Sequence, residues 1–371
     1  MAGEELTVRV DGRALRPRIP RVSGRIPPAA AHGGLAAALV LAALVAVSSG
    51  AFQIRPGEAI LILAHGLGFG PAEGFAGQQE AVLLSIRLPR VVLAIVVGAG
   101  LGASGAAMQA LFRNPLADPT LIGVAGGAAL AAATVIVMGV VWLPGLARSL
   151  GPATLPLAAF VGGLAAATLV YRIATHSGRT SIAVLLLAGI AVNALVEAGI
   201  GGFTYVANDE QLRNLAFWRL GSVGGASWAI LSFVGPAIVL ATLVLWRLAA
   251  PFNALALGEA EAGHLGISVQ RVKVVALIAA SLAVGAAVAV SGLIFFIGLV
   301  APHIVRLACG PDHRVVLPGA TALGAILVLV ADTVARTVAA PAELPLGVFT
   351  ALIGVPFFVA LLLRERRAWS L

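Results

Sequence analysis

This sequence is poor in the residues that soluble proteins use to cover their surfaces. Charged residues make up 11% of its 371 residues and aromatic residues 6%, whereas a soluble domain carries about 25% charged residues. The one cysteine, Cys309, cannot form a disulfide within the chain. The one lysine, Lys273, lies in Arg-Val-Lys-Val, so the sequence has no phosphate-binding loop of the Gly-Lys-Ser/Thr type. These shortages exclude a soluble enzyme, a disulfide-stabilised secreted domain and an ATPase of that class.

Apolar residues are correspondingly abundant. They make up 60% of the chain, and the mean hydropathy is +1.02. Because a membrane-spanning helix takes about 20 residues, we expect an all-α polytopic membrane protein with about ten transmembrane helices per subunit. The predicted spans are 34–52, 88–110, 120–141, 154–173, 181–203, 228–248, 272–291, 294–308, 315–336 and 346–363.

The seventh and eighth spans depart from this regular pattern. Ser291-Gly292 separates them, and the eighth is too short to cross about 30 Å of hydrocarbon by itself. We therefore expect the eighth span to be buried among other helices. An irregular segment that lines protein or a water-filled cavity should join it to the seventh.

The distribution of positive charge predicts the topology. The net charge is +8, but the arginines gather at the ends of the apolar runs rather than along one polar face, which argues against a nucleic-acid partner. Ten spans with both termini in the cytoplasm place most Lys and Arg residues on the cytoplasmic side, in agreement with the positive-inside rule. The smaller set on the opposite side is Arg55, Arg87, Arg90, Arg148, Arg213, Arg219 and Arg336.

The chain is predicted to have three regions. Residues 1–32 are a basic, flexible cytoplasmic tail, residues 33–364 are the ten-helix membrane domain, and residues 365–371 are a short cytoplasmic tail. A cleavable signal peptide is the alternative interpretation of the first apolar run, because small residues at 48–51 follow it. Cleavage would leave the orientation of the other spans unchanged.

Few ionisable residues lie inside the predicted spans. Glu197, His303 and Asp332 are candidates for function, because such groups are costly at membrane depth. Each is equally suited to a hydrogen bond between packed helices. Between the second and third spans, Asp118 is placed to cap the third helix, with Pro119 in its first turn, and this cytoplasmic turn is also placed for a gating role.

Residues 250–270 form the longest predicted inner loop after the tail. Asn253 is expected to cap a short helix that ends at Gly258, and Glu259 to Leu265 to form a second short helix. Two amphipathic helices at the cytoplasmic face indicate a docking surface for a partner. A helix that rests on lipid is the alternative, and the lack of Lys and Arg within this stretch argues against it.

Several independent motifs occur between about residues 85 and 363. They are Arg87-Leu-Pro-Arg90, Gly105-Ala-Ala-Met-Gln109, Arg113-Asn-Pro-Leu-Ala-Asp-Pro119, Leu257-Gly258 through Leu265-Gly266, Gly292 through His303, Ala331 through Arg336, and Glu343-Leu-Pro-Leu-Gly347. Together they resemble the iron-chelate, haem and cobalamin permease family, which are the membrane subunits of type II ABC importers.

The resemblance implies partners and residue roles. It implies a homodimer with a translocation channel at the dimer axis, two cytoplasmic ATPases that hold ATP and Mg, and one periplasmic binding protein, in a bacterial inner membrane. It implies no catalytic residue, metal site or resident cofactor in this chain. Arg87, Arg90 and Arg336 match positions that present arginines to carboxylates of the binding protein, and Asn114 and Leu116 match the cytoplasmic gate. The ATPase-coupling positions are Leu257, Gly258, Glu259, Ala262, Leu265 and Gly266.

The expected substrate rests on a shorter segment. Thr204 through Arg213, followed by Phe217-Trp218 and Gly221-Ser222, looks most like the haem-transporting members. A ferric siderophore or cobalamin is the alternative within the family, and an ion-gradient-driven carrier is the alternative outside it. Side chains able to contact haem iron are present, but a channel that passes haem without coordinating it is equally compatible. The possible contacts are Tyr205, His65 and His303.

Overall fold

The computed structural model describes residues 8–10, 13–15, 26–50, 52–69, 74–142, 144–340 and 342–369. In the predicted basic tail it describes an antiparallel pair of short strands, β1 (Val8–Val10) and β2 (Arg13–Leu15). The rest of the tail up to residue 25 lies outside the described residues, as do residues 370 and 371.

The described residues are almost entirely helical, which confirms the expected all-α class. The helices are α1 (Pro28–Ser48), α2 (Pro56–Gly66), α3 (Gly77–Val82), α4 (Leu88–Phe112), α5 (Val124–Trp142), α6 (Pro144–Leu150), α7 (Thr154–Ala174), α8 (Ile182–Val206), α9 (Asp209–Leu220), α10 (Trp228–Arg247), α11 (Ala249–Leu257), α12 (Glu259–His264), α13 (Val269–Ser291), α14 (Ile297–Cys309), α15 (His313–Val338) and α16 (Leu346–Trp369). Short connections are η1 (Leu83–Arg87), η2 (Pro119–Ile122), η3 (Gly151–Ala153) and the hairpin of β3 (Thr175–His176) with β4 (Arg179–Thr180).

Each of the ten predicted spans is found as an apolar helix. Seven helical stretches of the described chain are long and apolar enough to cross a membrane, and three more, in α5, α14 and α16, are apolar but shorter. The helix α14 is the short eighth span, and most of its side chains are buried, as its length requires.

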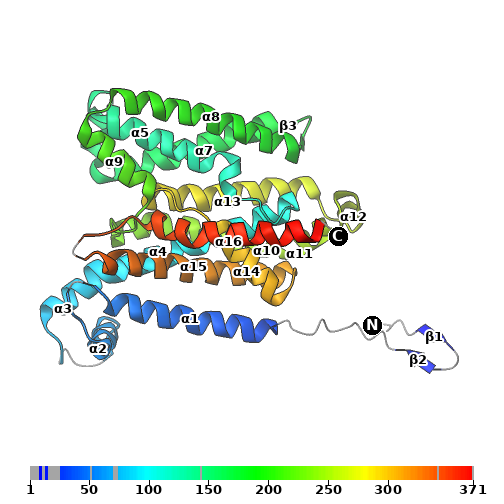
Figure 1. Ribbon diagram of the computed structural model, residues 1–371, viewed down its shortest axis with the longest axis horizontal. Helices are drawn as coiled ribbons and strands as arrows, with labels where there is room; N and C mark the ends of the chain where they lie inside the picture. Colours follow the sequence, from blue (N-terminus) through cyan, green and yellow to red (C-terminus); the bar gives the residue numbers. More distant parts are fainter. Residues whose placement is uncertain are drawn as a thin grey trace.

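The long helices run side by side in Figure 1. Helices α5, α7 and α8 gather along one side of the bundle, α1 lies along the opposite side, and α4, α13 and α15 lie between them. One end carries α2, α3 and α9, and the other carries α12 and the β3–β4 hairpin. Following the predicted topology, we call these the outer end and the inner end.

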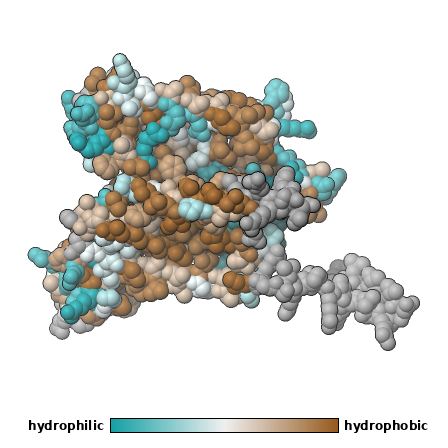
Figure 2. Space-filling model, viewed as in Figure 1, coloured by the Kyte–Doolittle hydropathy of each residue, from teal (hydrophilic) through white to brown (hydrophobic). Residues whose placement is uncertain are grey.

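The surface is apolar along the helices and polar at their ends. Figure 2 shows hydrophobic side chains across the middle of the molecule and hydrophilic side chains at the outer and inner ends. A bundle that lies across a bilayer requires this distribution, because hydrocarbon solvates no charged group. Both α1 at its start and α16 at its end lie at the inner end (Figure 1).

Small residues of α4 let its neighbours approach closely. A Cβ added at Gly105 would lie 1.8 Å from the carbonyl oxygen of Gly298 in α14, and one added at Gly102 would lie 2.1 Å from that of Ala320 in α15. In lipid, packing of this kind takes the place of the hydrophobic effect as the cause of helix association. These glycines therefore fix the centre of the bundle.

The irregular segment predicted after Ser291 is present at residues 292–296, between α13 and α14. Gly292 and Phe296 adopt the left-handed conformation, with φ of 66° and 67°. The carbonyl of Ser291 accepts a hydrogen bond of 2.7 Å from the amide of Ser222. Other protein groups thus form the hydrogen bonds that these backbone groups lack where the helix ends, which is necessary at membrane depth.

Two predicted boundaries are wrong. Residues 28–32, assigned to the tail, form the first turns of α1, because proline is favoured at the first helical position and alanine is the strongest helix former. Residues 365–369, also assigned to a tail, continue α16 to Trp369, since Arg, Glu and Ala favour helix.

Four helices outside the predicted spans were not predicted. They are α2, α3, α6 and α9, and Figure 1 shows α2, α3 and α9 at the outer end. For α9 the sequence holds a signal: Asn208 and Gln211 form reciprocal side-chain to backbone hydrogen bonds of 2.9 and 3.0 Å across its first turn. The segment compared with haem permeases therefore spans the end of α8, this cap and the start of α9.

Candidate functional sites at the two ends of the bundle

Arg90, near the start of α4, is the centre of a charge cluster at the outer end. Its guanidinium donates to both carboxylate oxygens of Asp332 in α15, at 2.9–3.1 Å, and to both of Glu343, at 2.7 and 3.0 Å. Such forked arrangements are the strongest arginine–carboxylate contacts. The Asp332 side chain is buried, whereas that of Glu343 is 49% exposed.

The second predicted docking arginine, Arg87, contacts backbone. Its guanidinium donates to the carbonyl oxygens of Val47 and Ser48 in α1, at 2.9 and 3.1 Å, and to that of Phe52. These carbonyls belong to the end of a helix and the turn after it, where no intrahelical donor is available. A positive charge there also interacts favourably with the helix dipole.

The third, Arg336, contacts the same region from α15. It donates to the carbonyl oxygen of Ser49 at 2.7 Å and to that of Ala46, and its Nε lies 3.7 Å from Asp332. Two arginines from helices far apart in sequence thus hold the outer end of α1. This contact matters because only 11% of the apolar window of α1 is buried.

These contacts change how the three arginines are interpreted. We expected exposed arginines, but Arg87 and Arg336 are only 5% and 8% exposed. Their side chains stabilise α1 in this structure. Arg90 differs, because it reaches the surface through its contact with Glu343.

The hydrogen bonds from Arg90 lower the pKa of Glu343 below its ordinary value, against the opposing effect of partial burial. Glu343 is in the loop between α15 and α16, outside the spans. It is therefore ionised across the physiological pH range, and the outer cluster keeps a carboxylate at its surface.

At the inner end, α11 and α12 form the predicted pair of short helices. Leu257 ends α11 and Leu265 follows α12, and the two side chains are 68% and 63% exposed. Ala262 and Gly258, predicted to contact a partner, are buried instead. Gly258 has φ of 137°, which a side chain would strain, so its role is to turn the chain between the two helices.

The prediction that Asn253 caps the first short helix is wrong. The helix α11 begins at Ala249, since it continues almost directly from α10, and Asn253 lies inside it. The Asn253 side chain donates to Asp312 at 2.6 Å and accepts from the amide of His313 at 2.9 Å. It therefore attaches α11 to the start of α15.

Glu259 opens α12 and forms an ion pair of 2.8 Å with Lys273 of α13. Lys273 also donates to the carbonyl oxygen of Thr180 in the β3–β4 hairpin, at 3.2 Å. This contact of Lys273 was not predicted from the sequence. A lysine inside a predicted span, 14 residues after a glutamate, was the available signal.

The predicted gate residues lie in the turn after α4. The side chain of Asn114 accepts a hydrogen bond of 2.9 Å from the amide of Leu116, and Asn114 is exposed. Asp118 accepts from the amide of Thr120 at 2.8 Å and so caps η2, the turn that leads into α5. Asp118 is therefore a cap, as predicted, but it caps η2 rather than the third helix, because α5 begins at Val124.

A buried glutamine joins α4 to α14 beside this turn. In a regular helix the amide of residue 302 would donate to the carbonyl oxygen of Gly298, but Pro302 has no N–H. Gln109 Nε2 lies 3.4 Å from this oxygen instead. Arg306 of α14 donates to Gln109 Oε1 at 2.8 Å. The proline that interrupts α14 is thus compensated by a side chain of the neighbouring helix.

The three possible haem contacts do not form one site within a subunit. His65 lies on α2, against Phe75 and 3.8 Å from Glu80. His303 is buried in α14 against Phe357, and Tyr205, at the end of α8, is 91% exposed. Figure 1 places α2 and α8 on opposite sides of the bundle.

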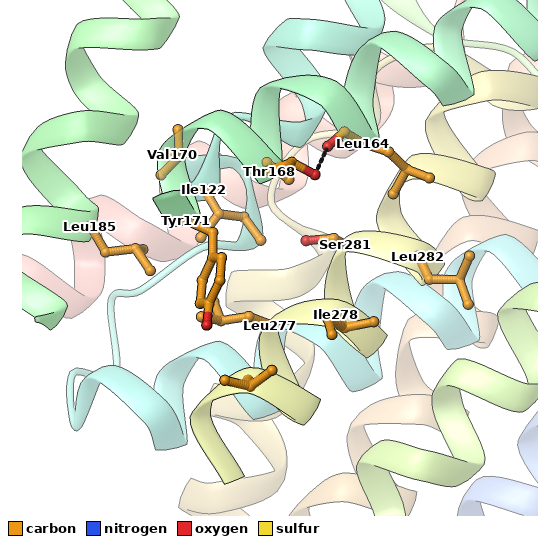
Figure 3. A pocket seen from close by; sticks show the side chains of 12 residues that line it. Ile122, Leu164, Thr168, Val170, Tyr171, Leu185, Leu277, Ile278, Ser281 and Leu282 are labelled. Carbon is orange, nitrogen blue, oxygen red and sulfur yellow. Dashed lines mark hydrogen bonds between the residues drawn. The ribbon is translucent and has the colours of Figure 1, made fainter. Parts of the chain in front are cut away.

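A crevice with a volume of about 380 Å³ lies among α7, α8 and α13. Figure 3 shows Tyr171 and Val170 from α7 and Leu277 and Ser281 from α13 around it. Its lining is mostly apolar. Within the described part of the chain, no cluster of three or more His, Cys, Asp or Glu side chains is placed to hold a metal ion.

Comparison with known proteins agrees with this architecture. Residues 38–364 match the FecCD transport family. The chain is 48% identical over 290 residues to the hemin transport system permease protein HmuU of Yersinia pestis, which covers 78% of this chain and 85% of that protein. It is 42% identical over 298 residues to the cobalamin import system permease protein BtuC of Halobacterium salinarum, which covers 80% and 77%.

A solved structure agrees as well. An inward-facing conformation of a metal-chelate type ABC transporter matches with a TM-score of 0.76 and 30% identity, over 90% of this chain and 98% of that one. This chain therefore belongs to the FecCD transport family, and it is a multi-span permease of an ABC importer rather than the ATPase.

Proposed function

We propose that this permease imports haem across a bacterial inner membrane. It works as a homodimer with two cytoplasmic ATPases, and it receives haem from a periplasmic binding protein. The observation that carries the substrate is the identity of 48% to a hemin permease, against 42% to a cobalamin permease. The segment at the junction of α8 and α9 supports the same substrate.

At the outer end, Arg90 is the arginine best placed to receive a carboxylate of the binding protein. It is the one of the three predicted docking arginines that contacts a partly exposed carboxylate, Glu343. An incoming carboxylate can exchange with Glu343 on the same guanidinium. Arg87 and Arg336 act behind it, because they fix the end of α1 next to this surface.

At the inner end, α11 and α12 receive the ATPases. The exposed leucines Leu257 and Leu265 supply apolar contacts for a cleft in each ATPase. ATP binding closes the two ATPases and moves these helices, and the bundle then changes between inward-open and outward-open states. The exposed turn at Asn114 and Leu116 lies where such a movement opens or closes the cytoplasmic mouth.

Haem passes without a protein ligand to its iron in this proposal. His303 is buried and His65 lies far from α8, so neither is placed on a path with Tyr205. Tyr205 is the residue of the three that is exposed to an entering substrate. Its role is a surface contact at the outer mouth, because an exposed aromatic side chain can stack on a planar ring.

The test is ATP hydrolysis and uptake by the permease and its ATPase in proteoliposomes. Binding protein is added empty, or loaded with haem, a ferric siderophore or cobalamin. We expect stimulation and uptake with haem. A response to another chelate alone overturns the haem assignment and keeps the importer.

Cobalamin is the second candidate, because the relatives also include vitamin B12 import permeases at 40–41% identity. Uptake that follows a proton gradient and ignores vanadate overturns the ATP-driven mechanism and supports a secondary carrier.

A further inference from the structure

Lys273 stands out because lysine occurs once in this chain and is buried here. Its side chain is 7% exposed, whereas that of its partner Glu259 is 41% exposed. Burial of an ammonium group is unfavourable unless charge and hydrogen bonds compensate for it. The Glu259 carboxylate and the Thr180 carbonyl supply this compensation, at 2.8 and 3.2 Å.

The β3–β4 hairpin is bonded to α13 through a single residue, Thr180. Its carbonyl accepts from Lys273, its amide donates to Gln270 Oε1 at 3.1 Å, and its hydroxyl accepts from Gln270 Nε2 at 2.6 Å. Every polar group of Thr180 thus contacts a side chain of α13. Because the hairpin connects α7 to α8, a displacement of this part of α13 also displaces the inner ends of both helices.

The packing above this contact leaves room for movement. A crevice of about 380 Å³ lies between part of α7 and part of α13 beyond Lys273, since Val274 is the first residue of α13 that lines it. Figure 3 shows Tyr171 of α7 and Leu277 of α13 around it. Further along, the two helices pack against each other, with Gly285 of α13 close to Phe160 of α7. Close-packed helices resist relative displacement, so the loosely packed inner parts are where the polar contact at Lys273 determines how α7 follows α13.

The two short inner helices are attached to different parts of the bundle. Asn253 attaches α11 to the start of α15, and Glu259 attaches α12 to Lys273 and the hairpin. Loss of the Lys273 contact therefore removes the ion pair that fixes α12 to α13 and one of the three hydrogen bonds of Thr180. Gln270 still holds the hairpin to α13, and α11 keeps its own attachment.

We propose that Lys273 is a positioning residue that transmits displacement of α12 to the α7–α8 hairpin when the ATPases close. The inference rests on the proposed function, because it requires ATPases that move α12. Its chemistry is one ion pair and one hydrogen bond to a backbone carbonyl, both of which Lys273→Met removes while an unbranched apolar side chain one atom shorter is kept.

The test measures this movement directly, without a transported substrate. The native Cys309 is replaced by serine, and His176→Cys on the exposed hairpin carries a spin label. Pulsed electron paramagnetic resonance on the complete complex in nanodiscs then gives the distance between the labels of the two subunits, with and without ATP and vanadate. Arg271→Met is the matched control, because Arg271 is an exposed cation on the same turn of α13.

We expect the ATP-dependent change in distance to be reduced in Lys273→Met, because α12 then lacks its ion pair to α13 and Thr180 lacks one of its three hydrogen bonds. The control variant should keep the full change. Lys273→Arg, which keeps the charge and can donate to both the Glu259 carboxylate and the Thr180 carbonyl, should keep a substantial part of it. Co-purification of the ATPases with each variant measures assembly in parallel.

A full change in Lys273→Met overturns the inference. Loss of the ATPases from Lys273→Met, without their retention in Lys273→Arg, also overturns it, in favour of a purely structural role. If the unmodified complex itself gives no ATP-dependent change, the proposed function fails instead, so the two failures are distinguishable.

Discussion

Asp332 is the most consequential carboxylate of the outer cluster. It is 1% exposed and accepts hydrogen bonds from Arg90. The Nε atom of Arg336 lies 3.7 Å from its carboxylate. Asp332→Asn keeps the size of the side chain but removes the charge and turns an amide N–H₂ towards guanidinium groups. Removal of one partner from a buried ion pair costs about 3–5 kcal/mol, because the remaining charge stays desolvated.

Glu343→Gln is the natural comparison. It removes a carboxylate from the same arginine, but this side chain is 49% exposed, and solvent-exposed ion pairs contribute about 0–1 kcal/mol. The unfolding entropy of about 2.1 cal/mol/K per residue, applied to 371 residues, converts the two costs to Tm shifts of roughly 4–6 °C and at most about 1 °C.

Thermal unfolding of both variants in the same detergent, followed by size-exclusion fluorescence, measures these shifts. We expect Asp332→Asn to lose several degrees more than Glu343→Gln. Equal shifts for the two variants would refute the reasoning that burial, rather than contact with Arg90, decides the cost.

Further predictions concern the outer pH response, the centre of the bundle and the inner surface. The hydrogen bonds from Arg90 lower the pKa of Glu343. The ionised carboxylate therefore contributes its full share of the folding stability above the ordinary glutamate pKa of about 4.3, and this share is lost as the pH falls through the lowered pKa. The Tm difference between wild type and Glu343→Gln should be constant from pH 8 to 6 and shrink only at strongly acid pH. Gly105→Val should destabilise the bundle by about 3 kcal/mol or prevent its assembly, since its Cβ would overlap a backbone carbonyl of α14; yield and Tm in detergent report this, with Gly201→Ala, which meets open space, as a neutral control. Leu257→Asp should reduce co-purification of the ATPases and leave the Tm within about 1 °C, because this side chain is 68% exposed; retention of the ATPases at the wild-type level would contradict the docking surface.

Hydropathy was sufficient to predict the spans, because bilayer thickness imposes one length scale on every helix that crosses it. Helix α13 and the break at residues 292–296 appeared where the pattern placed them. The helices α2, α3, α6 and α9 were missed for the same reason: outside the spans no such length scale applies. Their signals are local caps, such as the pair of Asn208 and Gln211.

The site residues were predicted less completely than the spans. Resemblance identified Arg87, Arg90 and Arg336 as a group, but only their contacts separate them. Arg87 contacts the backbone of a helix about 40 residues earlier, and sequence patterns carry little information on such pairs. The Asp332–Arg336 spacing of four residues was the one local sign of the outer cluster.

The attachment of α1 has a consequence for biosynthesis. Its outer end depends on Arg336, which lies 287 to 290 residues later in the chain. At about 5–20 residues per second, ribosomes need roughly 15–60 s to add that arginine after the end of α1 has been made. During this interval the first helix is already in the bilayer, and the carbonyls at its outer end have not yet received the hydrogen bonds of Arg336. Arg87, about 40 residues after this end, can bind its carbonyls much earlier. The full set of contacts at the outer end of α1 therefore forms in two stages, and the second waits until α15 has been made.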